Sequence, residues 1–170
     1  MGAVGLLFVG AVLFINGVML LGWVDAKSAA PINFFVGGLQ IITPTYLIFT
    51  ANGNADTILS AAGLYLFAFT YLYVGLNLTF GLDGTGLGYF CFFVFVSALV
   101  YSGLNFFHFG DNGFGVIWLC WAFLWLLFFL LIGIPAVRLI RRLERKMAFP
   151  RARPTLTGSV PTSLNCFRGL

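Results

Sequence analysis

The sequence contains very few charged residues, and this scarcity excludes most classes of soluble protein. Only 8% of the 170 residues are Asp, Glu, Lys or Arg, whereas soluble domains carry about 25%. Hydrophobic residues make up 61% of the chain and aromatic residues 18%. So few charges cannot cover the surface of a water-soluble globule. The composition therefore predicts a membrane domain and leaves no room for a soluble catalytic domain.

Residues that usually hold metals or form disulfides are also scarce. The sequence has one His and three Cys, and no two Cys form a CxxC pair. This set cannot complete a zinc shell, so we expect no metal site and no cofactor. We interpret Cys91, Cys120 and Cys166 as small apolar packing residues. The net charge of +4 comes almost wholly from one end of the chain, which argues against nucleic acid as a partner.

The few charges divide the chain into long uncharged stretches. Residues 1–24, 28–55, 57–82, 84–110 and 112–137 form stretches of 24 to 28 residues. A helix needs about 20 apolar residues to cross the hydrocarbon layer, so each stretch holds one span and a short turn. The sequence thus predicts an all-α integral membrane domain over residues 1–137, built as a bundle of five transmembrane helices. We expect the spans at about 2–23, 30–51, 58–80, 86–108 and 113–136.

The basic residues predict the orientation of this bundle. Eight of the nine Lys and Arg lie after the fifth span, and basic segments stay on the cytoplasmic side. We therefore expect residues 138–170 to form a basic cytoplasmic tail, partly disordered around its prolines. Five spans then place the N-terminus outside, with the turns at 25–27 and 83 inside and those at 52–56 and 109–113 outside.

Polar side chains within the spans allow two interpretations. No charged residue lies in the middle of a span, so ions and protons have no obvious carrier. Uncharged polar residues such as Asn16 and Asn77 do occur there. They either join helices by hydrogen bonds or line a path for an uncharged polar solute.

The aromatic residues show a helical spacing. Trp118, Trp121 and Trp125 are spaced i, i+3, i+7, which places them on one face of a helix. Phe69 and Tyr73 are four residues apart on another span. Such rings are either a packed core or a narrow slot for a small planar solute such as urea or an amide.

The turns contain an internal repeat. Asp25 is followed nine residues later by a Phe-Phe pair, and Asp83 is followed by another at the same distance. Both Asp residues precede an even-numbered span, where a carboxylate can cap the next helix. The repeat predicts a two-helix hairpin used at least twice, at 1–51 and 57–110. The small pair Gly84 and Gly88 favours close helix packing.

Several motifs follow one another along residues 4–132. They are Leu6–Gly10 with Asn16, Val24–Ser28, Asn33–Gly37, Phe69–Tyr73 with Asn77, Gly81–Asp83, and Trp118–Trp121 with Leu124 and Trp125. As an ordered set they resemble the bacterial acid-activated urea channel and short-chain amide transporter (UreI/AmiS) family.

The resemblance implies a fold, a function and a set of pore residues. It implies a hexamer in the bacterial inner membrane, in which three two-helix hairpins surround each protomer's own pore. The expected function is passive passage of small neutral amides, such as acetamide, or of urea, linked to a cytoplasmic amidase or urease. No enzyme activity is expected. The resemblance places the pore lining at Leu6, Leu13, Phe69, Tyr73, Trp118, Trp121 and Trp125.

The sequence departs from the family pattern in two places. Its outer turns are minimal and only His108 lies near one, so we expect no acid gate. Members of the family have a sixth transmembrane helix that contributes an acidic residue, and we expect no counterpart of it in the residues after Gly133. A truncated or degenerate member without transport activity, or a membrane assembly subunit, is therefore the alternative. An intramembrane hydrolase using Ser102 and His108 is disfavoured because these residues are six apart and lack an orienting carboxylate.

Overall fold

The computed structural model describes residues 2–134, which are helical apart from short turns. No strand occurs in this part of the chain, and the prediction of an all-α membrane fold is confirmed. Two helices continue directly into a π-helical turn, labelled η. The elements are α1 (Gly2–Leu20), α2 (Ala26–Thr50), α3 (Ala55–Phe80), α4 (Thr85–Leu104), η1 (Asn105–Phe109), α5 (Asn112–Phe128) and η2 (Phe129–Gly133).

Four helical segments are long and apolar enough to cross a membrane. They are α2, α3, α4 with η1, and α5 with η2, while the apolar part of α1 is shorter, at Val4–Leu20. The first helix ends three residues before the expected boundary at 23, and α2 begins four residues before the expected boundary at 30. The tail expected at 138–170 and the last residues of the fifth expected span lie outside the described residues.

Polar side chains in the turns fix where the helices begin. Asp25 Oδ2 accepts a 3.0 Å hydrogen bond from the backbone N–H of Lys27, so it caps α2. Asp83 Oδ1 accepts bonds from the backbone N–H and the hydroxyl of Thr85, at 3.1 and 2.7 Å. Both Asp residues thus bind the start of the following helix, as the repeat predicts. Asp111 does the same for α5, through a 2.9 Å bond from the N–H of Phe114.

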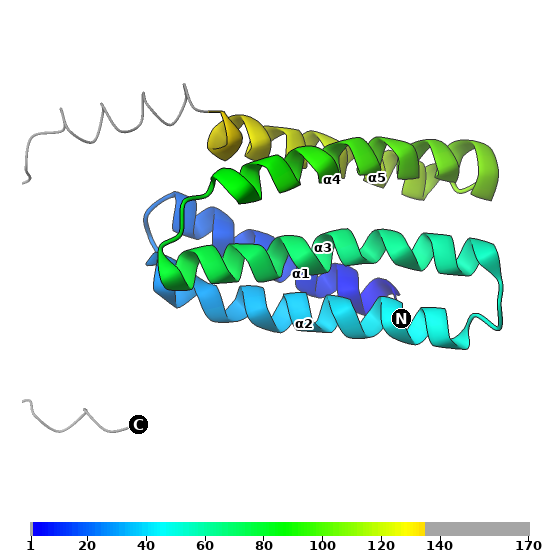
Figure 1. Ribbon diagram of the computed structural model, residues 1–170, viewed down its shortest axis with the longest axis horizontal. Helices are drawn as coiled ribbons and strands as arrows, with labels where there is room; N and C mark the ends of the chain where they lie inside the picture. Colours follow the sequence, from blue (N-terminus) through cyan, green and yellow to red (C-terminus); the bar gives the residue numbers. More distant parts are fainter. Residues whose placement is uncertain (1, 135–170) are drawn as a thin grey trace, which may run out of the picture.

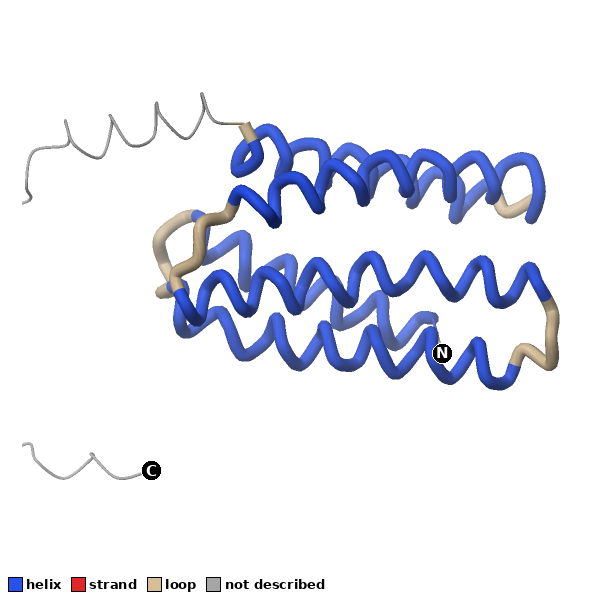
Figure 2. Tube along the Cα trace, in the orientation of Figure 1, coloured by secondary structure: helices blue, strands red, loops and turns tan. Residues whose placement is uncertain are grey.

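The helices form two groups (Figure 1). Helices α2 and α3 pack together along their lengths with α1 against α2, and α4 packs on α5. Figure 2 shows the short turns joining these long helices at the two ends of the bundle. The broadest contacts are thus α2 with α3 and α4 with α5, whereas the sequence repeat pairs the first helix with the second and the third with the fourth. The contacts between α3 and α4 are fewer.

The core lies between the two groups, and all five helices contribute to it. Val12, Val36, Phe67, Val94 and Trp125 are among its buried side chains. Gly88 of α4 lies against the backbone of Gly133, so close that a methyl group on Gly88 would overlap it. Small residues permit this approach. Large apolar side chains remain exposed around the outside, for example Phe49 and Phe107.

Candidate solute pathway

Four aromatic rings fill the centre of the bundle. The ring of Phe67 lies 4.5 Å from Trp121 and 4.8 Å from Trp125, in edge-to-face contacts, measured between ring centroids. It lies 5.8 Å from Trp118, which in turn meets Trp121 edge to face at 5.1 Å. We call Phe67, Trp118, Trp121 and Trp125 the aromatic plug. Three of its members are almost fully buried, and Trp121 is partly buried.

A hydrogen bond also joins α3 to the plug. The indole N–H of Trp125 donates a 3.3 Å hydrogen bond to the hydroxyl of Thr70. That hydroxyl donates to the carbonyl of Leu66 at 2.7 Å. Successive helix residues are about 100° apart, so Thr70 shares its face with Phe67. Sequence analysis missed Phe67, and its spacing from Thr70 is the signal that could have found it.

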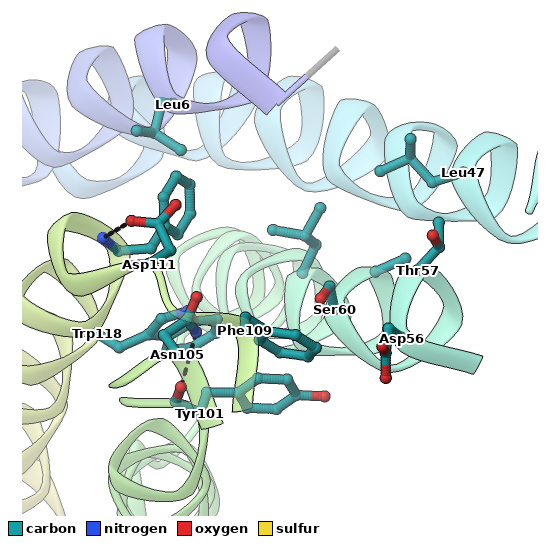
Figure 3. Close-up of a pocket in the computed structure, with 13 residues that line it drawn as sticks. Leu6, Leu47, Asp56, Thr57, Ser60, Tyr101, Asn105, Phe109, Asp111 and Trp118 are labelled. Atoms are coloured by element: carbon teal, nitrogen blue, oxygen red, sulfur yellow. Dashed lines mark hydrogen bonds between the residues drawn. The ribbon is translucent and has the colours of Figure 1, made fainter. Parts of the chain in front are cut away.

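One cavity opens at the end of the bundle formed by the turns at 51–54 and 110–111. This space, cavity I, has a volume of about 460 Å³. Figure 3 shows Leu6 of α1 and Leu47 of α2 on one side of it, with Tyr101 and Trp118 on the other. The ring of Tyr101 stacks on Trp118 at 4.7 Å, so cavity I ends at the aromatic plug.

Cavity I contains carboxylates and no Lys or Arg. Asp56 and Asp111 line it, and Asp56 also lies 2.9 Å from the Nε2 atom of His108. In this contact both side chains are more than half exposed. Lys27, at the opposite end of the bundle, is the one Lys or Arg among residues 2–134. The entrance is therefore acidic and disfavours anions.

A second cavity, cavity II, opens at the other end of the bundle, near the turns at 21–25 and 81–84. It has a volume of about 270 Å³. Its lining is mostly apolar, with Leu13, Leu87 and Trp125 among its walls. Uncharged polar groups also line it, from Asn16, Thr70, Tyr71 and Asn77.

The two cavities reach the aromatic plug from opposite sides. Trp118 lines cavity I and Trp125 lines cavity II, seven residues farther along α5. On α1, Leu6 lines cavity I and Leu13 lines cavity II, and these residues are also seven apart. Seven residues of helix span about 10.5 Å. A short aromatic barrier thus separates two spaces that open at opposite ends of the bundle.

The other residues expected to line the pore lie elsewhere. Trp121 belongs to the plug and lines neither cavity. Phe69 lies on another face of α3, where its ring is 50% exposed and stacks on Tyr65 at 6.0 Å. The ring of Tyr73 lies 6.5 Å from that of Phe90. Neither Phe69 nor Tyr73 lines cavity I or cavity II.

Asn16 and Asn77 differ in their hydrogen bonding. The amides of Asn16 and Asn33 exchange two hydrogen bonds, each 2.9 Å long. Asn16 thereby joins α1 to α2. Both polar side-chain atoms of Asn77 are buried, and neither has a hydrogen-bond partner in the described part of the chain.

The residues considered for metal binding and for nucleophilic catalysis are not brought together within residues 2–134. No group of three His, Cys, Asp or Glu side chains lies close enough to hold a metal ion there. The hydroxyl of Ser102 donates to the carbonyl of Gly115 at 2.8 Å. His108 contacts Asp56 instead of Ser102.

Comparison with known proteins identifies the family. The model of the AmiS/UreI family transporters matches residues 1–165. The chain belongs to this family. The match continues beyond the motifs at 4–132 and includes residues outside the described structure. Family membership and the apolar helices together make the chain a multi-pass membrane protein.

Individual relatives of this AmiS/UreI family member include transporters and channels. The chain is 54% identical over 141 residues to the transporter protein AmiS2 of Rhodococcus erythropolis, covering 83% of this chain and 68% of that protein. It is 55% identical over 134 residues to the amidate substrates transporter protein of Mycolicibacterium smegmatis, covering 79% and 63%. The chain thus spans about two thirds of the length of these relatives.

The fold matches a solved urea channel. The chain is 35% identical over 155 residues to the acid-activated urea channel of Helicobacter pylori, covering 74% of this chain and 78% of that protein. The crystal structure of the Helicobacter pylori urea channel superposes with a TM-score of 0.71 and 36% identity, covering 79% and 83% of the two chains. A closed-state structure of that channel gives a TM-score of 0.70 and 34% identity, covering 77% of this chain and 80% of that chain.

Proposed function

We propose that the protein is a passive channel for small neutral amides, such as acetamide and other short aliphatic amides, or for urea. The observation that carries this proposal is the pair of cavities separated by the aromatic plug. The named functions of two relatives, transport of amidate substrates and conduction of urea, support a related solute class.

The solute path runs from cavity I through the plug to cavity II. Leu6 and Trp118 line its first part, Trp121 lies at the barrier, and Leu13 and Trp125 line its second part. Planar amides suit this path because their flat faces can stack on the rings while their edges keep hydrogen-bonding capacity. Phe67 contributes to the barrier as well. The path contains no ionisable group at the plug, so transport needs no coupled ion or covalent step.

Phe69 and Tyr73 remain candidates for the path through the family resemblance. Phe69 lies on an exposed face of α3, whereas Tyr73 packs against the core near Phe90 of α4. If the path also passes these residues, replacing either of them by Ala will change the flux of amides. If it follows only the two cavities, these replacements will change flux less than replacement of Phe67.

The distribution of basic residues and the family resemblance support a biological setting for this channel. We place it in the bacterial inner membrane with the N-terminus outside, so that cavity I opens outward and cavity II faces the cytoplasm. The protein works as a homo-oligomer, a hexamer by resemblance, and is not itself an enzyme. A cytoplasmic amidase or urease consumes the solute and maintains the inward gradient.

Osmotic swelling of proteoliposomes tests the proposal. Vesicles containing the full chain are mixed with an excess of acetamide or urea, and light scattering follows the shrinking and reswelling. We expect reswelling faster than in empty vesicles. Equal rates in vesicles with correctly assembled oligomers would contradict a channel and favour the alternative, a degenerate family member or an assembly subunit.

A further inference from the structure

The side-chain amide of Asn77 is a buried polar group without a partner. Its Nδ2 and Oδ1 atoms are both removed from solvent, and neither makes a hydrogen bond within residues 2–134. A buried amide left unpaired is costly, and such groups are rare in folded proteins. Asn77 also lines cavity II, so a small rotation of its side chain would bring the amide into contact with a molecule in that cavity.

Tyr71 adds a phenol hydroxyl to the lining of cavity II, whereas two other uncharged polar side chains there, those of Asn16 and Thr70, are already engaged. Asn16 is paired with Asn33 by two hydrogen bonds. Thr70 donates to a backbone carbonyl and accepts from the indole of Trp125. Asn77 is therefore the amide of this cavity that is free to bind a solute.

A carboxamide presents one acceptor and two donors in a plane. Asn77 can accept an N–H from a solute and donate to its carbonyl oxygen, which closes a ring of two hydrogen bonds between two amides. The protein contains this arrangement once already, because Asn16 and Asn33 exchange two bonds of 2.9 Å. The same geometry is thus accessible between Asn77 and a free amide.

The surroundings of Asn77 define which amides fit. Leu78, Leu82 and Leu87 line the same cavity, so a short aliphatic group finds apolar walls. A carboxylate has only acceptor atoms, so it offers no hydrogen-bond donor to Asn77 Oδ1. An N,N-dialkyl amide lacks the N–H that this oxygen requires. A solute that leaves a buried polar group of the protein unpaired is rejected more strongly than a solute that differs from the preferred one only in size.

We propose that Asn77 is the recognition group of cavity II and binds unsubstituted carboxamides, including urea, through a paired amide–amide contact. This inference deepens the proposed function and rests on it for the route by which the solute arrives. It assigns to one side chain the selection of neutral amides over the corresponding carboxylates and over N,N-dialkyl amides.

Binding is measured separately from transport, so that the two proposals can fail independently. Saturation-transfer NMR follows acetamide, N,N-dimethylacetamide and acetate in the presence of the purified full chain in detergent. We expect the wild-type protein to bind acetamide saturably, to release it when urea is added, and to bind the other two solutes at least tenfold more weakly. Equal binding of acetate or N,N-dimethylacetamide would overturn the inference.

Substitution of Asn77 tests its role directly. Asn77→Leu should weaken acetamide binding about tenfold, which corresponds to about 1.4 kcal/mol. Asn77→Asp has nearly the same shape, serves as a second variant if the Leu variant fails to assemble, and should also weaken binding. The matched control is Thr79→Val, because the Thr79 hydroxyl bonds to the carbonyl of Gly75 in its own helix. Unchanged acetamide binding in either assembled Asn77 variant, or an equal loss in T79V, would overturn the inference.

The combination of binding and flux separates the two proposals. Flux in the wild type with unaltered binding in N77L would overturn the role of Asn77 and leave the channel intact. Selective binding that depends on Asn77 without any flux would overturn the channel and leave the binding site intact. Absence of acetamide binding to the wild type would overturn the binding site.

Discussion

Replacement of Phe67 by Ala should open the barrier between the two cavities. Phe67 is the ring that contacts all three tryptophans of the plug, at centroid distances of 4.5, 4.8 and 5.8 Å. It is also almost fully buried, with 2% of its surface exposed. Because cavity I and cavity II are separate spaces, a solute can pass only if some of these rings move apart. Removing the Phe67 ring removes part of the cost of that movement.

The size of the effect follows from the ring contacts. An aromatic pair contributes about 0.5–1.5 kcal/mol beyond its buried area. If passage requires separation of Phe67 from one tryptophan, the substitution lowers the barrier by this amount, which raises the permeability about 2- to 13-fold. The wider opening should also admit longer amides such as butyramide, so selectivity for short amides should decrease.

Stopped-flow light scattering of proteoliposomes measures this permeability, and the chain offers a matched control. Phe69→Ala removes the same ring two residues along α3, from a side chain that is 50% exposed and lies outside the plug. Phe67→Leu serves as a milder variant if the Ala variant does not assemble. Equal permeability in assembled F67A and F69A vesicles, or a lower permeability in F67A than in the wild type, would refute the barrier assigned to Phe67.

Three further predictions concern the helix contacts and the entrance. Asn33→Leu leaves the amide of Asn16 unpaired and should lower the stability in detergent by about 1–3 kcal/mol, measured by thermal unfolding. The double variant with Asn16→Leu removes both amides and should recover part of the loss. No recovery would contradict the view that these two amides pair only with each other across the helices. Gly88→Ala should cost about 1–3 kcal/mol through overlap with a neighbouring backbone, whereas in Gly84→Ala the new methyl meets its nearest atom at 3.8 Å and should cost less. The exposed contact between His108 and its carboxylate partner is worth about 0–1 kcal/mol, so acidification from about pH 8 to about pH 5 should change acetamide flux by less than about fivefold. A larger change that disappears in His108→Ala would contradict the expected lack of an acid gate.

Much of the fold could be predicted from the sequence because the bilayer restricts what an uncharged segment can form. The isolated Asp residues mark the turns, and Asp25 and Asp111 bind the backbone at the start of the next helix. The last residues of α1 and the π-helical turns at 105–109 and 129–133 could not be predicted. The positions of these helix ends and turns depend on packing between helices and not on a local sequence signal.

The candidate site could be predicted only in part. The spacing of Trp118, Trp121 and Trp125 places them on one face of a helix, and the structure brings all three to the plug. The face of α3 is harder to predict, because aromatic residues occur around much of that helix. The face that meets the tryptophans is held by ring contacts of Phe67 and by a hydrogen bond between Thr70 and Trp125, which are 55 residues apart in the sequence. The sequence also does not distinguish the paired Asn16 from the unpaired Asn77, because Asn16 obtains its partner only through the packing of α1 against α2.

Exchange of labelled acetamide at equal concentrations on both sides of the membrane tests passive passage through the bundle most directly. The assay uses proteoliposomes of the full chain without an osmotic, pH or ion gradient. We expect label to enter faster than into empty vesicles, with no change on addition of a protonophore, and faster still in Phe67→Ala vesicles. Entry no faster than into empty vesicles, or entry that requires an imposed ion gradient, would contradict a passive amide channel.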